Sequence, residues 1–464
     1  MTASTVTTRF APSPTGYLHL GNARTALFNF LFAGREAGRF LLRIEDTDRE
    51  RSDERFVQAL VEDLRWLGLD WEQDGMCRQS ERGEVYAEHY ARLGEQGLTY
   101  PCFCTREELA LSRKANLAAG RPPRYSGKCA GLNAEQIEAR LARGEQPTLR
   151  FRVLAGREVV FDDLVRGEQR FASQEIGDFI IRRADGTPAF FFTNAVDDAL
   201  MGISHVFRGE DHLTNTPRQI LLIEALGLTA PRYGHISMIV GGDGSPLSKR
   251  HGSLGLRDLR QAGFLPGAVN NYLARLGHYY GHDDYVGLDR LAAQFDPARL
   301  SRSPAGHDDG RLLFWQKEAV AHADFGTLWA WVDPATRDRV PQVDAEAFIT
   351  AVRDNARLPE DIAHWAERVY AETLTWDEPA RAAMQNAGAD FFRAAVAALA
   401  LHGTDFQALA GEVKQRTGTR GKALFMPLSA ALTGELQGPE LARLLPLIGV
   451  ERARRRLEIG LSER

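Results

Sequence analysis

His19, Gly21 and Asn22 form a short segment whose residue types suit the binding of a phosphate group. They lie at the start of a helix that the apolar spacing predicts over residues 21–37, and a helix N-terminus offers free N–H groups and a positive dipole end. Glycine lets a ligand approach the backbone, and the histidine and asparagine side chains can donate to phosphate oxygens. Taken alone, so short a segment is more typical of an ordinary surface turn that contains a histidine.

A second segment, residues 246–252, carries a lysine that fits the same chemistry. Its polar residues include Ser248, Lys249 and Arg250. Glycines in the preceding stretch, residues 241–244, would leave this loop free to close. A flexible ammonium group stabilises charge on phosphate oxygens when a nucleophile attacks phosphorus and pyrophosphate leaves. The alternative is a glycine-rich surface turn with a solvated Lys-Arg pair, and the two segments together favour a nucleotide site.

The elements around the first segment are those of a nucleotide-binding α/β domain. Residues 6–11 and 40–44 are short apolar runs that predict buried strands on either side of the helix over 21–37. Glu45 follows the second run. It therefore lies at the carboxyl edge of the expected parallel sheet, where such sheets bind their ligands.

The rest of the chain divides into an irregular stretch and a helical one. An insertion is expected at about residues 86–187, after which the sheet resumes with strands at 189–192 and 205–207. A helix is expected to begin at Thr216 and Pro217, with the threonine as N-cap. Beyond about residue 320, alanine, leucine and arginine at helical spacing predict an all-helical C-terminal domain.

Five blocks of sequence, in order along the chain, resemble the glutamyl-tRNA synthetase family of class I aminoacyl-tRNA synthetases: residues 9–16, 43–49, 194–198, 208–212 and 215–219. The blocks cover most of residues 5–280, and the helical tail matches more loosely. The resemblance implies an α/β fold: a Rossmann-type parallel-sheet catalytic domain with an inserted acceptor-binding subdomain, then an all-α anticodon-binding domain. The implied boundaries are 1–85 and 188–240 (catalytic), 86–187 (inserted), 241–322 (stem-contact region with the Lys249 loop) and 323–464 (anticodon-binding).

The resemblance also implies an activity and its partners. Members of this family convert L-glutamate and ATP with Mg²⁺ into a glutamyl-adenylate, then pass the acyl group to the terminal adenosine of tRNA(Glu). They need bound tRNA before activation proceeds, and some also charge tRNA(Gln). The residues implied for catalysis are His19 and Lys249. Those implied for ATP binding are His19, Gly21, Asn22, Glu210, Ser248, Lys249 and Arg250.

The charges of the expected amino-acid site suit glutamate, which carries two carboxylates and one ammonium group. Arginine recognises a carboxylate through a planar fork, and a glutamate side chain can pair with an ammonium group. By resemblance, Arg9 and Arg208 hold the side-chain carboxylate, Glu45 and Ser13 hold the amino group, and Asn194 also faces the amino acid. A surface salt bridge is the alternative role for each arginine.

Two positions depart from the family pattern. Pro246 stands where the loop segment usually begins with a lysine, so one of two expected cations is missing, and Arg250 is a candidate to compensate. Phe190 stands where the family usually has a tyrosine whose hydroxyl faces the amino acid. Phenylalanine cannot make that hydrogen bond, so the position is either an ordinary buried aromatic or the source of an altered grip on the substrate.

The cysteines of the insertion form a candidate zinc site. Cys102, Cys104 and Cys129 supply thiolates, and zinc prefers four ligands. The histidine that some family members place two residues after the last cysteine is Gly131 here, which cannot ligate. A related family pattern uses a tyrosine four residues before that cysteine, and Tyr125 fits it. Three reduced cysteines without a metal are the alternative.

Composition and charge narrow the class of protein without identifying it. The 464 residues are 44% hydrophobic and 26% charged, with four cysteines, which fits a globular, reduced and cytoplasmic protein. No apolar run is long enough to span a membrane, and the N-terminus lacks a secretory h-region. We expect a monomer. The net charge of −5 does not exclude RNA binding, which depends on local basic patches such as Arg452–Leu457.

Two other functions compete with the leading one. The first is tRNA nucleoside modification by a truncated paralogue, which ends near residue 300 and lacks the helical domain. The second is a catalytically weakened protein that binds ATP and tRNA, suggested by Pro246 and Phe190. The presence of His19, Lys249, Arg9 and Arg208 disfavours the weakened protein.

Overall fold

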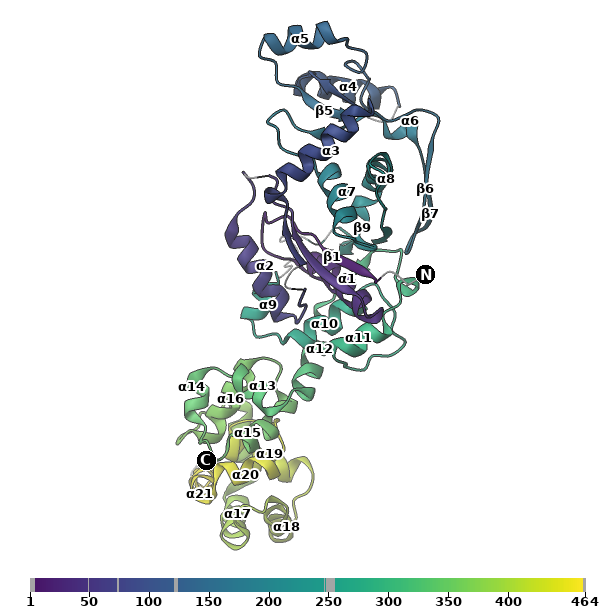
Figure 1. The fold of residues 1–464 in the computed structure, drawn as a ribbon. Coiled ribbons are helices and arrows are strands. Elements are labelled where there is room, and N and C mark those ends of the chain that lie inside the picture. The colour runs from purple at the N-terminus through teal and green to yellow at the C-terminus, as the bar shows by residue number, and fades with distance from the viewer. Residues whose placement is uncertain are drawn as a thin grey trace. The chain divides into compact units, whose positions relative to one another are not determined.

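The computed structural model describes residues 5–48, 50–72, 75–120, 124–245, 247 and 255–461. The chain forms two compact units: Met1–Leu259 with Val269–Asp309, and Arg260–Ala268 with Gly310–Arg464 (Figure 1). Among the described residues, no helix combines the length and apolar character needed to cross a bilayer. The predicted division into four parts is finer than these two units and stays a prediction.

A parallel sheet lies at the centre of the first unit. Strands β1 (Thr7–Phe10), β2 (Arg39–Ile44) and β3 (Met76–Arg78) pair in the order β1-β2-β3, and β9 (His205–Gly209) pairs with β10 (Arg232–Ile236), all in parallel. Strands β1 and β9 lie side by side. The spatial order is therefore β3-β2-β1-β9-β10. The order of the strands along the chain reverses between β1 and β9, as it does in a Rossmann-type sheet.

Side chains supplement a backbone hydrogen bond at the junction between β1 and β9. The Ser204 N–H donates to the carbonyl of Thr7 (2.9 Å), and the Thr7 N–H donates to Ser204 Oγ (2.8 Å). The amide of Asn29 bonds both the N–H and the carbonyl of Phe207 (3.2 and 2.8 Å). Asn29 belongs to α1 (Leu20–Arg35), which packs against β1, β2 and β9.

One expected strand is a helix. Residues 189–192 were predicted as a buried strand from three consecutive phenylalanines, but Phe190 begins α7 (Phe190–Leu200). Helical geometry sends the three rings to different surroundings: Phe192 stacks on Tyr90 in the core, whereas Phe190 lies beside His212. A short apolar run does not distinguish a strand from the first turn of a buried helix.

The N-cap predicted for the helix after β9 is also wrong. Helix α8 spans Thr216–Ala225 with Asn215 as its N-cap residue, and Pro217 occupies the first turn as expected. The Thr216 hydroxyl makes no capping bond because it lies against His235 and Arg208. The expected strands at 6–11, 40–44 and 205–207 correspond to β1, β2 and β9.

The insertion carries its own small sheets. Strands β4 (Thr99–Cys102), β5 (Thr148–Phe151) and β8 (Phe179–Arg182) form an antiparallel sheet, and β6 (Glu158–Asp163) and β7 (Gly167–Ala172) form a hairpin. The remaining elements of the first unit, including two helices shared with the second, are α2 (Glu54–Trp66), η2 (Gln79–Glu81), α3 (Gly83–Glu95), α4 (Arg106–Ala118), α5 (Ala134–Ala142), α6 (Ser173–Ile176), η3 (Glu210–Asn215), β11 (Ile239–Val240), α9 (Leu256–Gln261), α10 (Pro266–Arg275), α11 (Leu288–Gln294), η5 (Pro297–Arg299) and β12 (Ala305–Gly306).

Described residues of the second unit form helices and no strands, as the sequence predicted. Its elements are α12 (Asp309–His322, beginning at the unit boundary), α13 (Phe325–Trp331), α14 (Pro334–Arg339), α15 (Ala345–Val352), η6 (Arg353–Asn355), α16 (Pro359–Tyr370), α17 (Glu378–His402), α18 (Phe406–Thr417), α19 (Lys422–Thr433), α20 (Leu441–Ile448) and α21 (Val450–Ile459). Buried Arg456 joins two helix C-termini by donating to the carbonyls of Leu432 (2.5 Å) and Ala371 (2.7 Å). This arginine, which lies in the basic stretch 452–457, is therefore part of the core.

Candidate active site

A cavity of about 550 Å³ opens at the carboxyl ends of β1, β9 and β10, beside the N-terminus of α1. This is the point where the strand order reverses, and open α/β sheets bind ligands there. Of the predicted site residues, its wall contains Arg9, Ser13, His19, Gly21, Asn22, Glu45, Asn194 and Arg208. The fold thus gathers around one cavity all the residues expected to contact glutamate and the N-terminal residues expected to contact ATP.

His19 is the N-cap of α1. Its ring Nδ1 accepts hydrogen bonds from the backbone N–H groups of Gly21 (3.1 Å) and Asn22 (3.4 Å), so the neutral ring carries its proton on Nε2. Desolvation lowers the pKa of His19, which favours this neutral form. A Cβ at residue 21 would lie 3.0 Å from Cε1 of the ring. Glycine therefore makes room for the histidine, which already satisfies two N–H groups of the helix terminus.

Arg208 is a buried cation without a carboxylate partner among the described residues. It is 5% exposed; its Nη2 donates to Thr216 Oγ1 (2.8 Å) and Gln219 Oε1 (2.7 Å), and its Nε donates to His235 Nε2 (3.2 Å). Burial lowers the pKa of Arg208 to about 10. Its Nη1 has no hydrogen-bond partner in the part of the chain that the structure describes. An unused donor on a buried cation at a cavity wall is complementary to an anionic ligand.

Arg9 reaches the same cavity and is oriented by Asp198. Its Nε and Nη2 donate to the two carboxylate oxygens of Asp198 over 3.0 and 3.3 Å. Arg43 donates to the same carboxylate (2.6 Å) and, through Nη2, to Glu45 Oε1 (3.1 Å). Burial opposes ionisation of Asp198, but the guanidinium groups of Arg43 and Arg9 lower its pKa to about 2. The carboxylate thus stays charged and fixes both arginines.

Glu45 is the buried carboxylate of the cavity wall, to which the exposed Asp211 also contributes. Its Oε1 accepts from Asn194 Nδ2 (2.8 Å) as well as from Arg43. Burial raises the pKa of Glu45 although the Arg43 guanidinium opposes the shift. A positively charged group bound in the cavity would favour the ionised form.

Arg43 and Asp198, which bind the cavity residues Glu45 and Arg9, are residues that the sequence interpretation quoted within larger blocks without assigning them a role. Their spacing carried a signal. Arg43 lies in β2 and Glu45 just beyond its end, two residues apart, so in extended chain they share one face. Asn194 and Asp198 lie four apart and share one face of α7. The helical spacing of Asn194 and Asp198 could not be recognised, because the residues just before Asn194 were predicted to form a strand.

Other predicted residues lie elsewhere or outside the described chain. Glu210 is not among the residues lining the cavity; it forms an ion pair with Arg166 and accepts from the Met238 N–H (2.9 Å). Pro246, Ser248, Lys249 and Arg250 lie outside the described residues. Leu247 lines the cavity, and Gly255 forms a β-bridge with His19.

Phe190 lines the cavity, with its ring centroid 5.4 Å from that of His212. Burial lowers the pKa of His212 to about 4, with Arg208 contributing in the same direction. The departure from tyrosine at position 190 therefore lies at the cavity wall, where the Phe190 side chain is half-buried rather than part of the core.

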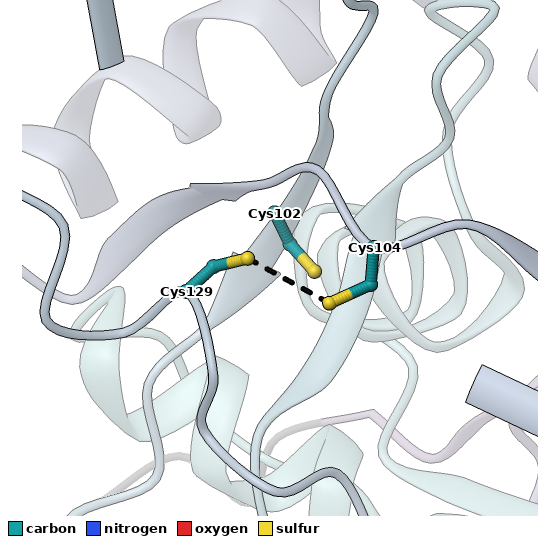
Figure 2. Close-up of side chains that lie close together, drawn as sticks. All are labelled: Cys102, Cys104 and Cys129. Atoms are coloured by element: carbon teal, nitrogen blue, oxygen red, sulfur yellow. Dashed lines mark hydrogen bonds between the residues drawn. The ribbon is translucent and has the colours of Figure 1, made fainter. Parts of the chain in front are cut away.

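The cysteines of the insertion cluster as the sequence interpretation requires. The Sγ atoms of Cys102, Cys104 and Cys129 all lie within 4.8 Å of one another (Figure 2). The Tyr125 hydroxyl lies 3.4 Å from the sulfur of Cys102 and 3.5 Å from that of Cys104. Although burial opposes it, hydrogen bonds from Tyr125 and Arg150 lower the pKa of Cys102 to about 7. The donor set suits a four-coordinate soft metal ion such as zinc.

Two family models match the chain. Residues 5–313 match the catalytic domain of tRNA synthetases class I (E and Q), and residues 320–461 match an anticodon binding domain.

Full-length relatives are similar along the whole chain. A protein of Nitrosococcus oceani named glutamate–tRNA ligase 2 is 58% identical over 99% of this chain and 98% of its own length. One of the same name from Alkalilimnicola ehrlichii is 55% identical over the same shares. The crystal structure of a glutamate tRNA ligase from Elizabethkingia meningosepticum in complex with its amino acid matches with a TM-score of 0.84 at 26% identity, covering 99% of both chains.

Proposed function

This chain belongs to the class I tRNA synthetases for glutamate and glutamine, and we propose that it attaches glutamate to tRNA(Glu) through a glutamyl-adenylate made from MgATP. Glutamate's α-carboxylate attacks the α-phosphorus of ATP and pyrophosphate leaves. A ribose hydroxyl of the terminal adenosine of the tRNA then attacks the carbonyl carbon, and AMP leaves. Neither step needs a covalent bond to the enzyme, so the work of the chain is alignment and stabilisation of charge.

The observation that carries the amino-acid specificity is the unpaired, buried Nη1 of Arg208, a residue that contributes to the cavity wall. A carboxylate there would supply the acceptor and the negative charge that the described chain does not supply. Arg9 offers a second guanidinium for the same group, while Glu45, with Ser13 and Asn194, would receive the ammonium group. Glutamine carries no charge on its side chain and would leave Arg208 uncompensated. The arrangement therefore favours glutamate over glutamine.

The nucleotide would lie along the α1 side of the cavity. His19 presents Nε2–H as a donor, and Gly21 and Asn22 lie beside it. In the sequence, Lys249 lies between Leu247 and Gly255. Leu247 lines the cavity, and Gly255 forms a β-bridge with His19. Both flanks of the loop thus lie at this cavity, which supports a role for Lys249, with Ser248 and Arg250, at the triphosphate. Glu210 is the least supported of the proposed ATP contacts because it does not line the cavity.

The partner of the helical unit would be the anticodon of tRNA, consistent with the match of residues 320–461 to an anticodon binding domain. By resemblance, the bound tRNA would also be needed for glutamate activation. Whether tRNA(Gln) is a second acceptor depends on contacts made by that unit. The same unit argues against the truncated modification enzyme, which would end before it.

The cysteine cluster would hold a structural zinc ion through Cys102, Cys104, Cys129 and Tyr125. The three sulfurs and the phenolic oxygen converge. The cations that act on these thiols are the guanidinium group of Arg150 and the exposed ammonium group of Lys128. Bound zinc would neutralise the thiolates and tie the turn after β4 to residues 125–129. That constraint would rigidify the part of the insertion expected to meet the acceptor end.

The decisive experiment is glutamate-dependent ATP–pyrophosphate exchange, with and without purified tRNA(Glu) or tRNA(Gln). We expect exchange with glutamate that requires tRNA(Glu), and none when glutamine replaces glutamate. Binding of tRNA without any exchange would instead support the weakened ATP- and tRNA-binding protein.

A further inference from the structure

A line of buried hydrogen bonds runs from the inserted hairpin to Arg208. The carboxylate of Asp163, the last residue of β6, lies 2.5 Å from His235 Nδ1, and the Nε2 of the same ring lies 3.2 Å from Arg208 Nε. Asp163 and His235 have no exposed side-chain surface. Neither residue lines the cavity, so neither can touch the ligand directly.

The chemistry of the end groups fixes the proton on the ring. Arginine Nε is always a donor, so His235 Nε2 must accept, and the ring proton must reside on Nδ1, where Asp163 accepts it. Burial lowers the pKa of His235, and the nearby Arg208 guanidinium acts in the same direction. The neutral Nδ1–H tautomer therefore satisfies Asp163 and Arg208, and it also lets Nε2 accept from the Thr216 hydroxyl, which lies 3.0 Å away.

The rest of the Arg208 guanidinium is held by α8. Thr216 and Gln219 receive the two bonds from Nη2, and His235 receives the bond from Nε. With those nitrogens fixed, Nη1 is the remaining one, and it is without a partner in the described chain. The orientation of the free donor thus depends on His235 together with Thr216 and Gln219.

We propose that Asp163 and His235 are positioning residues, which select the His235 tautomer that aims Arg208 at the carboxylate of the amino-acid substrate. This inference rests on the proposed role of Arg208 in glutamate binding. It assigns to the insertion a part in forming the amino-acid site, because Asp163 comes from the β6–β7 hairpin and not from the parallel sheet.

The substitution Asp163→Asn should invert the tautomer. Asp163 Oδ1 accepts backbone N–H groups from Val165 (3.0 Å), Arg166 (2.8 Å) and His235 (3.2 Å). In the variant, the amide oxygen would keep those three donors, so its NH₂ group would face His235 Nδ1. The ring would then carry its proton on Nε2. That N–H would repel the Arg208 Nε–H and would turn to Thr216 Oγ1, which lies 3.0 Å from Nε2, so Arg208 Nε would lose its acceptor.

Asp162→Asn is the matched control, since it makes the same chemical change one residue away on an exposed side chain. We expect Asp163→Asn to raise the KM for glutamate at least tenfold in tRNA-dependent exchange, with the KM for ATP changed less than about twofold. Asp162→Asn should leave both constants unchanged. A loss that affects both substrates equally, or only the fraction of active enzyme, would mean that Asp163 is merely structural.

A second pair of variants keeps the test independent of the folding of Asp163→Asn. His235→Gln retains an acceptor near the position of Nε2 and should keep the KM for glutamate within about threefold, whereas His235→Leu removes the acceptor and should raise it at least tenfold. Equal KM values for these two variants would overturn the proposal.

Nitrogen-15 chemical shifts of the histidine rings give a readout that needs no activity. With the signal assigned by comparison to His235→Gln, the parent protein should show His235 protonated on Nδ1, and Asp163→Asn should show protonation on Nε2. An Nε2–H tautomer in the parent would refute the positioning role whatever the enzyme does. An Nδ1–H tautomer in a protein without glutamate-dependent exchange would instead count against the proposed function.

Discussion

Arg43 Nη1 lies 2.6 Å from Asp198 Oδ1, and neither side chain has appreciable contact with solvent. Neither residue of the pair lines the cavity, but each binds a residue that does. Asp198 binds the positively charged Arg9, and Arg43 binds the negatively charged Glu45. A positive and a negative ligand contact are thus fixed by one buried ion pair, which links recognition of a carboxylate to recognition of an ammonium group.

Asp198→Asn should therefore lower both the stability of the protein and its affinity for glutamate. Removal of one partner from a buried ion pair leaves the other charge uncompensated, which costs about 3–5 kcal/mol. We expect the free energy of unfolding, measured with urea, to fall by about that amount, and the KM for glutamate to rise at least tenfold because Arg9 loses its orientation.

Asp185→Asn is a suitable control because Asp185 lies exposed in the turn after β8. The role assigned to Asp198 would be wrong if its variant unfolded at the same urea concentration as this control and kept the parent KM.

Local chemistry made much of the cavity predictable from the sequence. Arg9 and Arg208 are the penultimate residues of β1 and β9, and Glu45 directly follows β2. The carboxyl ends of parallel strands converge in space, so charged residues at those positions identify a site without coordinates. The apolar runs of β1, β2 and β9 have the length and composition of buried strands, and the helical spacing beyond residue 320 is equally direct.

The remainder depends on tertiary contacts that no local pattern encodes. Nothing in the sequence around His235 indicates a special role, because its hydrogen-bond partner at Nδ1 is Asp163, which lies 72 residues earlier. The apolar run Phe190–Phe192 is compatible with a strand or with a helix. The helix buries Phe192 against Tyr90, a contact that the local sequence does not reveal. Thr216 favours capping in isolation, but its hydroxyl is used by His235 and Arg208.

Phe190→Tyr should tighten glutamate binding. The ring lines the cavity, and a para-hydroxyl group would offer the substrate a hydrogen bond worth about 0.5–1.5 kcal/mol, which corresponds to roughly a two- to tenfold lower KM for glutamate. Phe191→Tyr is the matched control, since Phe191 packs against the hydrophobic core and does not line the cavity. An unchanged or higher KM in Phe190→Tyr would mean that the missing hydroxyl does not limit the grip on glutamate.

The purified protein should contain about one zinc ion per chain by metal analysis. Cys104→Ser should lose the metal and lower the melting temperature, because the cluster would then leave two thiols and a phenol without a shared cation. Cys77→Ser removes the cysteine that lies outside the cluster and should keep the full zinc content. Equal zinc content in the two variants would exclude the cysteine cluster as the metal site.

The stability of the first unit should fall as the pH decreases from about 6.5 to 4. Burial lowers the pKa of His278 to about 4, and its ring stacks on Phe295 while Nε2 accepts the Asp296 N–H over 3.1 Å. The unfolded chain binds a proton at this residue below its ordinary pKa of about 6.5, whereas the folded chain does not until about pH 4. Each pH unit in that window therefore removes up to about 1.4 kcal/mol of stability.

Urea unfolding of the parent and His278→Gln at pH 7, 6 and 5 isolates this contribution. The variant should lose less stability per pH unit than the parent, while His322→Gln, at an exposed histidine of α12, should retain the parent slope. Identical slopes for the parent and His278→Gln would show that the buried ring does not carry the pH dependence.

Lys249→Ala should separate catalysis from tRNA binding. If the ammonium group stabilises charge on the phosphates during adenylate formation, its removal should lower the rate of pyrophosphate exchange by about 100-fold or more, whereas the affinity for tRNA should stay within about twofold of the parent value. Lys249→Arg keeps the charge at the same position and should retain more exchange than the alanine variant. An equal loss of exchange rate and tRNA affinity would instead place Lys249 in the RNA interface. A residue that contacts only the triphosphate should change the exchange rate without changing the affinity for tRNA.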